Sequence, residues 1–283
     1  MSIYNTLRSY WWDNALMARH MKLQAKRVWW NFLTAWEKTT PGLYNKIQTG
    51  YRQQRPSAEQ TVSSEAYGTV VTVNGVRMKI DPRMTPFQVK KLIDGRHTRE
   101  ERRLLIHRLE PDDIVMELGG GIGMLAIACA LKIGGERVYS YEANPVLESL
   151  IRENYALNDV KPEINMCMLD ETHDTCTFHV SEHFSRSSAF KPADDKTVPY
   201  EVAVKPLNDE IARIKPTVLI MDVQGSEGKL LSFANLSTVS KLLVEVHPDM
   251  LGLSNANALR RNLRTQGFEE VERSGQSFLY IRK

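Results

Sequence analysis

Hydrophobic and polar positions divide the chain into short apolar runs separated by amphipathic segments. Runs bounded by turn residues or charges, as expected for strands buried on both faces, lie at 114–118, 137–141, 163–169, 218–222 and 241–247. Helices are predicted between and after them, at 124–133, 146–157, 207–214, 229–238 and 255–266. With two short closing strands near 269–273 and 277–282, this alternation predicts an α/β fold. We expect a Rossmann-like, mostly parallel seven-stranded sheet.

The part of the chain before this core has its own pattern. Two alternating runs, 69–73 and 76–80, flank Asn74-Gly75, which is a strong signal for a β-hairpin. Two helices are predicted after the hairpin, at 86–94 and 98–109. Within the core, two further strands are predicted at 175–180 and 198–204. The predicted organisation is a helical extension, a polar linker, a hairpin with helices, and the core, at 1–55, 56–66, 67–112 and 113–283.

A glycine-rich loop joins the first core strand to the first core helix. Its glycines let the backbone turn tightly and approach a ligand, and the following helix offers backbone N–H groups. Glu142 ends the next strand, 19 residues after Gly123, where a carboxylate can accept two hydrogen bonds from a ribose diol. These features predict a site for an adenosine-containing cofactor.

The spacing of the glycines selects among such cofactors. The dinucleotide fingerprint Gly-x-Gly-x-x-Gly would need its last glycine at Met124 or Ala126. The observed order, Glu117-x-Gly119-x-Gly121-x-Gly123, is that of loops that hold S-adenosylmethionine (SAM). The predicted cofactor-binding residues are Glu117, Gly119, Gly121, Gly123, Glu142, Asn144, Leu169, Asp170 and Asp222.

Charge is unevenly distributed along the chain. The net charge is +3, but residues 1–56 hold nine Lys/Arg and two acids, which makes +7 there and −4 in the remainder. All five tryptophans lie in the same basic segment. We consider three roles for residues 1–55: packing or homodimerisation, binding to an anionic membrane surface, and nucleic-acid binding, which we rank lowest. No apolar run reaches the ~18 residues of a membrane span.

The three cysteines, Cys129, Cys167 and Cys176, lack zinc-type spacing, which fits a reducing compartment. We therefore expect a cytoplasmic protein, with peripheral membrane attachment as the alternative. No His, Cys or carboxylate cluster has the spacing of a metal site, so no metal is expected.

Several stretches resemble the FkbM-type SAM-dependent methyltransferases over roughly residues 68–283. The matching stretches are 117–123, 141–145, 154–158, 221–227 and 244–247. The resemblance implies O-methylation of small molecules or glycans. Two departures stand out: Glu117-x-Gly119-Gly120-Gly121 replaces Asp-x-Gly-Ala-Asn, and Gln224 replaces a glutamate. Glutamine cannot act as a base.

Candidate catalytic residues lie where the later strands end. Methyl transfer to a hydroxyl is aided by a general base, and His247 is the best candidate. Asp222 is placed to contact the methionine amino group or the acceptor, and His97 the acceptor. We therefore expect an O-methyltransferase acting on a sugar, glycan or secondary-metabolite hydroxyl. Two alternatives stay open: a non-catalytic nucleotide-fold binding protein, and a nucleic-acid methyltransferase that uses the basic segment.

Overall fold

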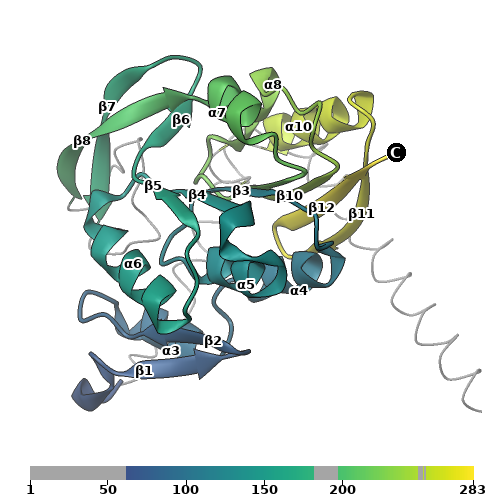
Figure 1. The fold of residues 1–283 in the computed structure, drawn as a ribbon. Coiled ribbons are helices and arrows are strands. Elements are labelled where there is room, and N and C mark those ends of the chain that lie inside the picture. Colours follow the sequence, from purple (N-terminus) through teal and green to yellow (C-terminus); the bar gives the residue numbers. More distant parts are fainter. Residues whose placement is uncertain (1–61, 182–196, 248–250, 252) are drawn as a thin grey trace, which may run out of the picture. The chain divides into compact units, whose positions relative to one another are not determined.

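The computed structural model describes residues 62–181, 197–247, 251 and 253–283 (Figure 1). All of them belong to one compact unit, Ala58–Lys283. The predicted extension 1–55 and the first part of the predicted linker lie outside the described residues. In the rest of that linker, Ser64–Ala66 forms a turn of 3₁₀ helix, and Val62 and Ala66 pack against the hydrophobic core.

A seven-stranded sheet forms the centre of this unit, in the order β11-β12-β10-β9-β3-β4-β5. Neighbours from β10 to β5 are parallel, whereas β12 runs antiparallel to both β10 and β11. The strands are β3 Val115–Leu118, β4 Val138–Tyr141, β5 Glu163–Asn165, β9 Val218–Met221, β10 Lys241–Glu245, β11 Phe268–Ser274 and β12 Ser277–Arg282. Every residue of β3 and β9 is buried, because helices cover both faces of the sheet. The predicted Rossmann-like fold is confirmed.

Helices α4 and α5 lie on one face of the sheet, and α7, α8 and α10 lie on the other (Figure 1). Their bounds, with the remaining helices, are α3 Pro86–Ile93, α4 Arg99–Leu105, α5 Met124–Ile133, α6 Glu148–Leu157, α7 Leu207–Ile214, α8 Glu227–Phe233 and α10 Leu253–Thr265. Helix α5 is almost wholly buried, as its run of Ala, Leu and Ile predicts. No helix in the described part of the chain is long and apolar enough to cross a membrane.

The predicted hairpin is present as β1 Val70–Val73 and β2 Val76–Lys79. Asn74 and Gly75 both have positive φ, 50° and 83°, as a type I′ turn requires. The hairpin is held against α6, since Asn154 Oδ1 accepts from Lys79 N at 2.9 Å. Asn154 also donates to Ile122 O at 2.9 Å, so it ties the hairpin to the glycine loop.

The predicted third strand, 163–169, is wrong as a single element. It divides into β5, which pairs with β4, and β6 Met168–Asp170, which belongs to a separate three-stranded sheet with β8 Thr197–Pro206 and β7 Asp174–Ser181. Cys167 N bonds back to Asn165 O at 3.1 Å, and this turn redirects the chain toward β8. An apolar run does not show such a change of partner.

Helix α8 also differs from the predicted 229–238, since it begins at Glu227 and ends at Phe233. Ala234 is extended, and Asn208 holds the chain there: it donates to Phe233 O and accepts from Asn235 N at 2.7 Å. A side chain from α7 therefore sets the end of α8.

Candidate functional site

A cavity of about 630 Å³ opens at the carboxyl ends of the parallel strands, where ligands bind in sheets of this kind. One half is formed by the glycine loop and the ends of β4 and β6; its lining includes Glu117, Gly119, Gly120, Gly121, Glu142 and Leu169. The other half comes from the segment around α3 and α4 and from the β11–β12 turn. Asp222, Gln224 and Glu245 also line the cavity, whereas His247 is not among its lining residues.

The glycine loop places a bare backbone against the cavity. Gly119 and Gly120 donate to Tyr141 O at 2.9 and 3.0 Å, which fixes the loop to the end of β4. At Gly119 a Cβ would lie 1.9 Å from the main-chain oxygen of Asp222, so only glycine fits. At Gly121 a Cβ would meet no atom within 4 Å, and the residue lines the cavity, so open space for a ligand begins there.

Two buried carboxyl groups lie behind this loop. Glu142 accepts from Gly121 N and Asn144 N, both at 2.7 Å, and the backbone N–H of Ala143 also faces its carboxylate. Glu117 accepts from Ser140 Oγ at 2.6 Å. Burial raises the pKa of both carboxyl groups to about 7. The open space at Gly121 and the acceptor capacity of Glu142 fit the adenosine moiety of SAM.

Glu142→Ala is expected to weaken SAM binding about ten- to 150-fold, because a charged hydrogen bond to ribose contributes about 1.5–3 kcal/mol. Since a protonated carboxyl is a poorer acceptor, the affinity of the native protein should also fall as the pH drops through about 7. Calorimetry across pH measures both effects. Glu142→Gln serves as the matched control, because it keeps one oxygen and should remove the pH dependence. A loss below twofold in the alanine variant would place the ribose elsewhere.

Three predicted cofactor residues do not line the cavity. Gly123 packs on α6, where a Cβ would lie 2.8 Å from Tyr155 Cε1. Asn144 is buried and its Oδ1 accepts from Val146 N at 3.1 Å, so it caps the turn before α6. Asp170 pairs with Lys229 at 2.5 Å, whereas its neighbour Leu169 does line the cavity. Gly123 and Asn144 thus shape the site through neighbouring elements.

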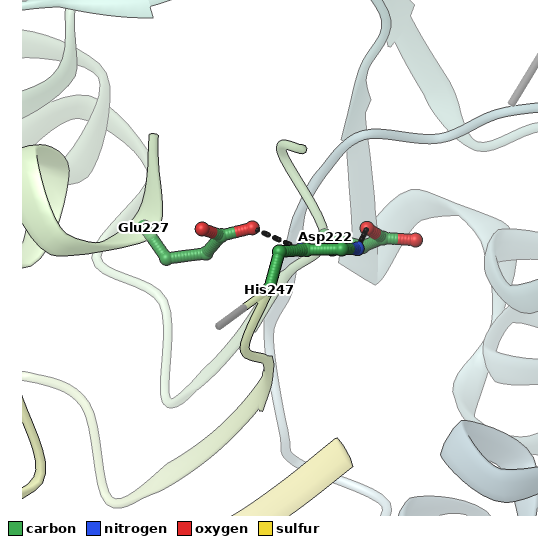
Figure 2. Close-up of side chains that lie close together, drawn as sticks. All are labelled: Asp222, Glu227 and His247. Atoms are coloured by element: carbon green, nitrogen blue, oxygen red, sulfur yellow. Dashed lines mark hydrogen bonds and ion pairs between the residues drawn. The ribbon is translucent and has the colours of Figure 1, made fainter. Parts of the chain in front are cut away.

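His247 follows β10 and lies between two carboxylates (Figure 2). Its Nδ1 is 2.7 Å from Glu227 Oε1, and its Nε2 is 3.6 Å from Asp222 Oδ1 and 3.9 Å from Glu245 Oε1. Glu227 is fully buried and also accepts from Gly225 N at 3.1 Å. Because Glu227 holds one ring nitrogen, the other is directed toward Asp222 at the cavity wall.

The charges around His247 set its protonation. Burial lowers the pKa of the imidazole, but the hydrogen bond to Glu227 and the charges of Asp222, Glu227 and Glu245 outweigh it and raise the pKa to about 9. Burial raises the pKa of Asp222 to about 6 and that of Glu245 to about 8. Gln224 donates to Asp222 at 3.2 Å, which a glutamate there could not do without a proton. The glutamine therefore avoids a further negative charge in this cluster.

Asp222, Glu227 and His247 are also close enough to hold a metal ion, a grouping that spacing along the chain did not predict. However, the two carboxylates face opposite nitrogens of one imidazole ring. One ion can take only one of those nitrogens, so the arrangement suits a carboxylate that orients a histidine better than a shared metal site.

The half of the cavity around α3, α4 and the β11–β12 turn, called the outer half below, was not predicted from the sequence, apart from His97. It is lined by Phe87, Lys91, Arg96, His97, Glu100, Glu101, Ser274 and Ser277, among others. Burial lowers the pKa of His97 to about 4, so that ring is neutral near pH 7. The signal for this half in the sequence was Phe87 followed by Lys91, one helical turn later.

Comparison with known proteins identifies the type of domain. A profile of the TRM5/TYW2 methyltransferase domain matches residues 69–183, which is 115 of 283 residues. This stretch includes the hairpin, the glycine loop and Glu142. The chain contains a SAM-dependent methyltransferase domain. Its cofactor is SAM, as the glycine loop predicted.

Two curated relatives match short stretches of this chain. A ribosomal protein L11 methyltransferase of Carboxydothermus hydrogenoformans is 35% identical over 65 residues, 23% of this chain and 21% of that protein. A tRNA (guanine(37)-N(1))-methyltransferase of Phytophthora infestans is 34% identical over 71 residues, 25% of this chain and 17% of that protein. The chain thus matches about a fifth of each relative's length.

A methyltransferase FkbM of Methylobacillus flagellatus is among the similar solved structures. It is 16% identical, with a TM-score of 0.41, over 70% of this chain and 56% of that one. The finer expectation of an FkbM-type enzyme is not confirmed and stays a prediction.

Proposed function

We propose that the protein transfers the methyl group of SAM to an acceptor that His247 deprotonates. The observation that carries this proposal is the imidazole held by Glu227 at 2.7 Å, with its other nitrogen 3.6 Å from Asp222, a residue that lines the cavity. When bound, SAM supplies an electrophilic methyl group. The chain then has to align the acceptor and accept its proton at His247 Nε2.

For the acceptor, we propose RNA. The matching profile is that of a family named for TRM5 and TYW2, and one curated relative is a tRNA methyltransferase. The +7 charge of residues 1–56 would favour a polyanion. Nucleic acid, ranked lowest from the sequence alone, therefore becomes the leading acceptor class, and the glycan acceptor gains no support from the comparisons.

A hydroxyl of a sugar or secondary metabolite is the second candidate. The stretch from Asp222 to Glu227, which carries the FkbM resemblance, supplies two of the three side chains around the imidazole. A general base in that position suits a weakly acidic hydroxyl as well as a ring nitrogen.

Incubation with methyl-labelled SAM and separated cell fractions tests both candidates. We expect label in the RNA fraction that ribonuclease releases, and none with His247→Gln. Label in the glycan or metabolite fraction would replace RNA with the second candidate. SAM binding without any transfer would favour the non-catalytic binding protein.

A further inference from the structure

The outer wall of the cavity carries an aromatic ring that the fold does not use. Seven large hydrophobic side chains are exposed in the described part of the chain, and Phe87 is the most exposed, at 65%. Among those seven, it is also the one that lines the cavity. Helix α3 buries Val89 and Leu92 and leaves the ring of Phe87 outside the core. The ring is therefore available to a ligand that enters the cavity.

Cationic side chains surround this ring. Lys91, one turn later on α3, places Nζ 5.8 Å from the ring centroid. Arg96 lines the same wall and keeps 49% of its side chain exposed while it pairs with Asp94. An exposed aromatic face flanked by cations is the combination with which proteins hold a single-stranded nucleic acid, since bases stack on the ring and phosphates approach the cations.

The wall is fixed before any ligand arrives. Thr85 and Gln88 form a reciprocal capping box at the first turn of α3: Gln88 Oε1 accepts from Thr85 N at 2.8 Å, and Thr85 Oγ1 from Gln88 N at 3.3 Å. On the opposite side, Ser274 and Ser277 of β11 and β12 donate to the carboxylates of Glu100 and Glu101 on α4. These two acids thus serve as bridges across the wall, and the turn carrying Phe87 needs no reordering to accept a base.

We propose that Phe87 is a stacking platform for an unpaired base of the RNA acceptor, with Lys91 and Arg96 contacting the adjacent phosphates. This inference rests on the proposed function and names how the acceptor is held. A neutral sugar could also lie on the ring but would make no use of the two cations. The two cations beside the ring therefore favour a nucleotide chain.

Binding of a labelled, unstructured oligoribonucleotide to the full-length protein with S-adenosylhomocysteine tests this directly. Loss of one base stack should weaken binding about five- to 150-fold in Phe87→Ala, and Phe87→Trp should restore it. Ile93→Ala is the matched control, because Ile93 is exposed on the same helix but does not line the cavity. Lys91→Ala should reduce the salt dependence of binding by about one phosphate contact.

Equal affinity of Phe87→Ala and the native protein, with S-adenosylhomocysteine binding intact, would overturn the platform. So would equal losses in Phe87→Ala and Ile93→Ala. The labelled-SAM assay separates this failure from that of the proposed function. If RNA is methylated and Phe87→Ala leaves its KM unchanged, the platform is wrong and the RNA acceptor stands. If the oligoribonucleotide does not bind and label enters glycans, both are wrong.

Discussion

Replacing His247 with alanine is expected to lower turnover by ~10²–10⁴-fold while SAM affinity stays near its native value. The imidazole faces Asp222, which lines the cavity, because Glu227 holds the other ring nitrogen. Without the ring, the acceptor keeps its proton in the transition state. Steady-state kinetics with the labelled acceptor and calorimetry with SAM measure the two quantities separately.

The alanine variant also leaves Glu227 fully buried without its histidine, so some stability should be lost. His247→Gln is the matched control: its amide can donate to Glu227 but cannot accept a proton at neutral pH. We expect both variants to lose turnover and the alanine variant alone to lose thermal stability. Native turnover in the glutamine variant would make His247 a structural residue.

The same residue predicts a pH profile. A base must be neutral to accept a proton, and the pKa of His247 in the free protein is raised to about 9. At limiting SAM, kcat/KM should therefore rise about tenfold per pH unit from about pH 7 and level off above about 9, with a steeper rise below 7, where SAM affinity also falls. The positive sulfonium opposes a protonated imidazole, so the midpoint for kcat should lie at lower pH. Glu227→Gln removes one negative charge and should move both midpoints down; unchanged midpoints would mean that another group titrates.

Features set by adjacent residues were predictable from the sequence. One such feature is the unit made of β3, the glycine loop, α5 and β4. An apolar run, a cluster of glycines and a second apolar run follow one another there within 30 residues, and the loop glycines have the positive φ that glycine allows. Asn74-Gly75 likewise fixes the hairpin because the turn needs positive φ at both residues. Glu142 lies against the loop because a βαβ unit brings the ends of β3 and β4 together, and its contact with the ribose stays a prediction.

Features set by contacts between residues far apart in the sequence were not predictable from it. The division between β5 and β6 depends on pairing with β8, about 35 residues later. That Glu227 holds His247 depends on the end of β10 lying against the start of α8, which periodicity does not reveal. In the outer wall of the cavity, the Ser277 hydroxyl donates to the Glu101 carboxylate, 176 positions away in the sequence. Asn144 and Gly123 were assigned to the cofactor because their motifs adjoin the site. Asn144 instead caps the turn before α6, and Gly123 packs against Tyr155 of α6.

The second large effect on SAM binding is expected in the glycine loop. Gly121→Val should abolish SAM binding with little unfolding. A Cβ at Gly121 meets no atom within 4 Å, so the valine side chain would occupy cavity space rather than displace the fold. Gly119→Ala gives the contrast, because its Cβ would lie 1.9 Å from Asp222 O and should destabilise the loop. Calorimetry with SAM and thermal unfolding of the three proteins distinguish loss of ligand space from loss of fold.

Backbone strain has to be separated from steric blocking in this test. Gly121 has φ of +55°, and a side chain in the left-handed region costs about 1–2 kcal/mol. Gly121→Ala carries the same kind of backbone cost with a smaller side chain, so the difference between alanine and valine isolates the volume that enters the cavity. We expect both variants to unfold a few degrees below the native protein and valine alone to lose SAM binding altogether. If the Gly121→Val variant binds SAM as tightly as the Gly121→Ala variant does, the cofactor does not contact Gly121, and the cavity beside Glu142 holds it in another orientation.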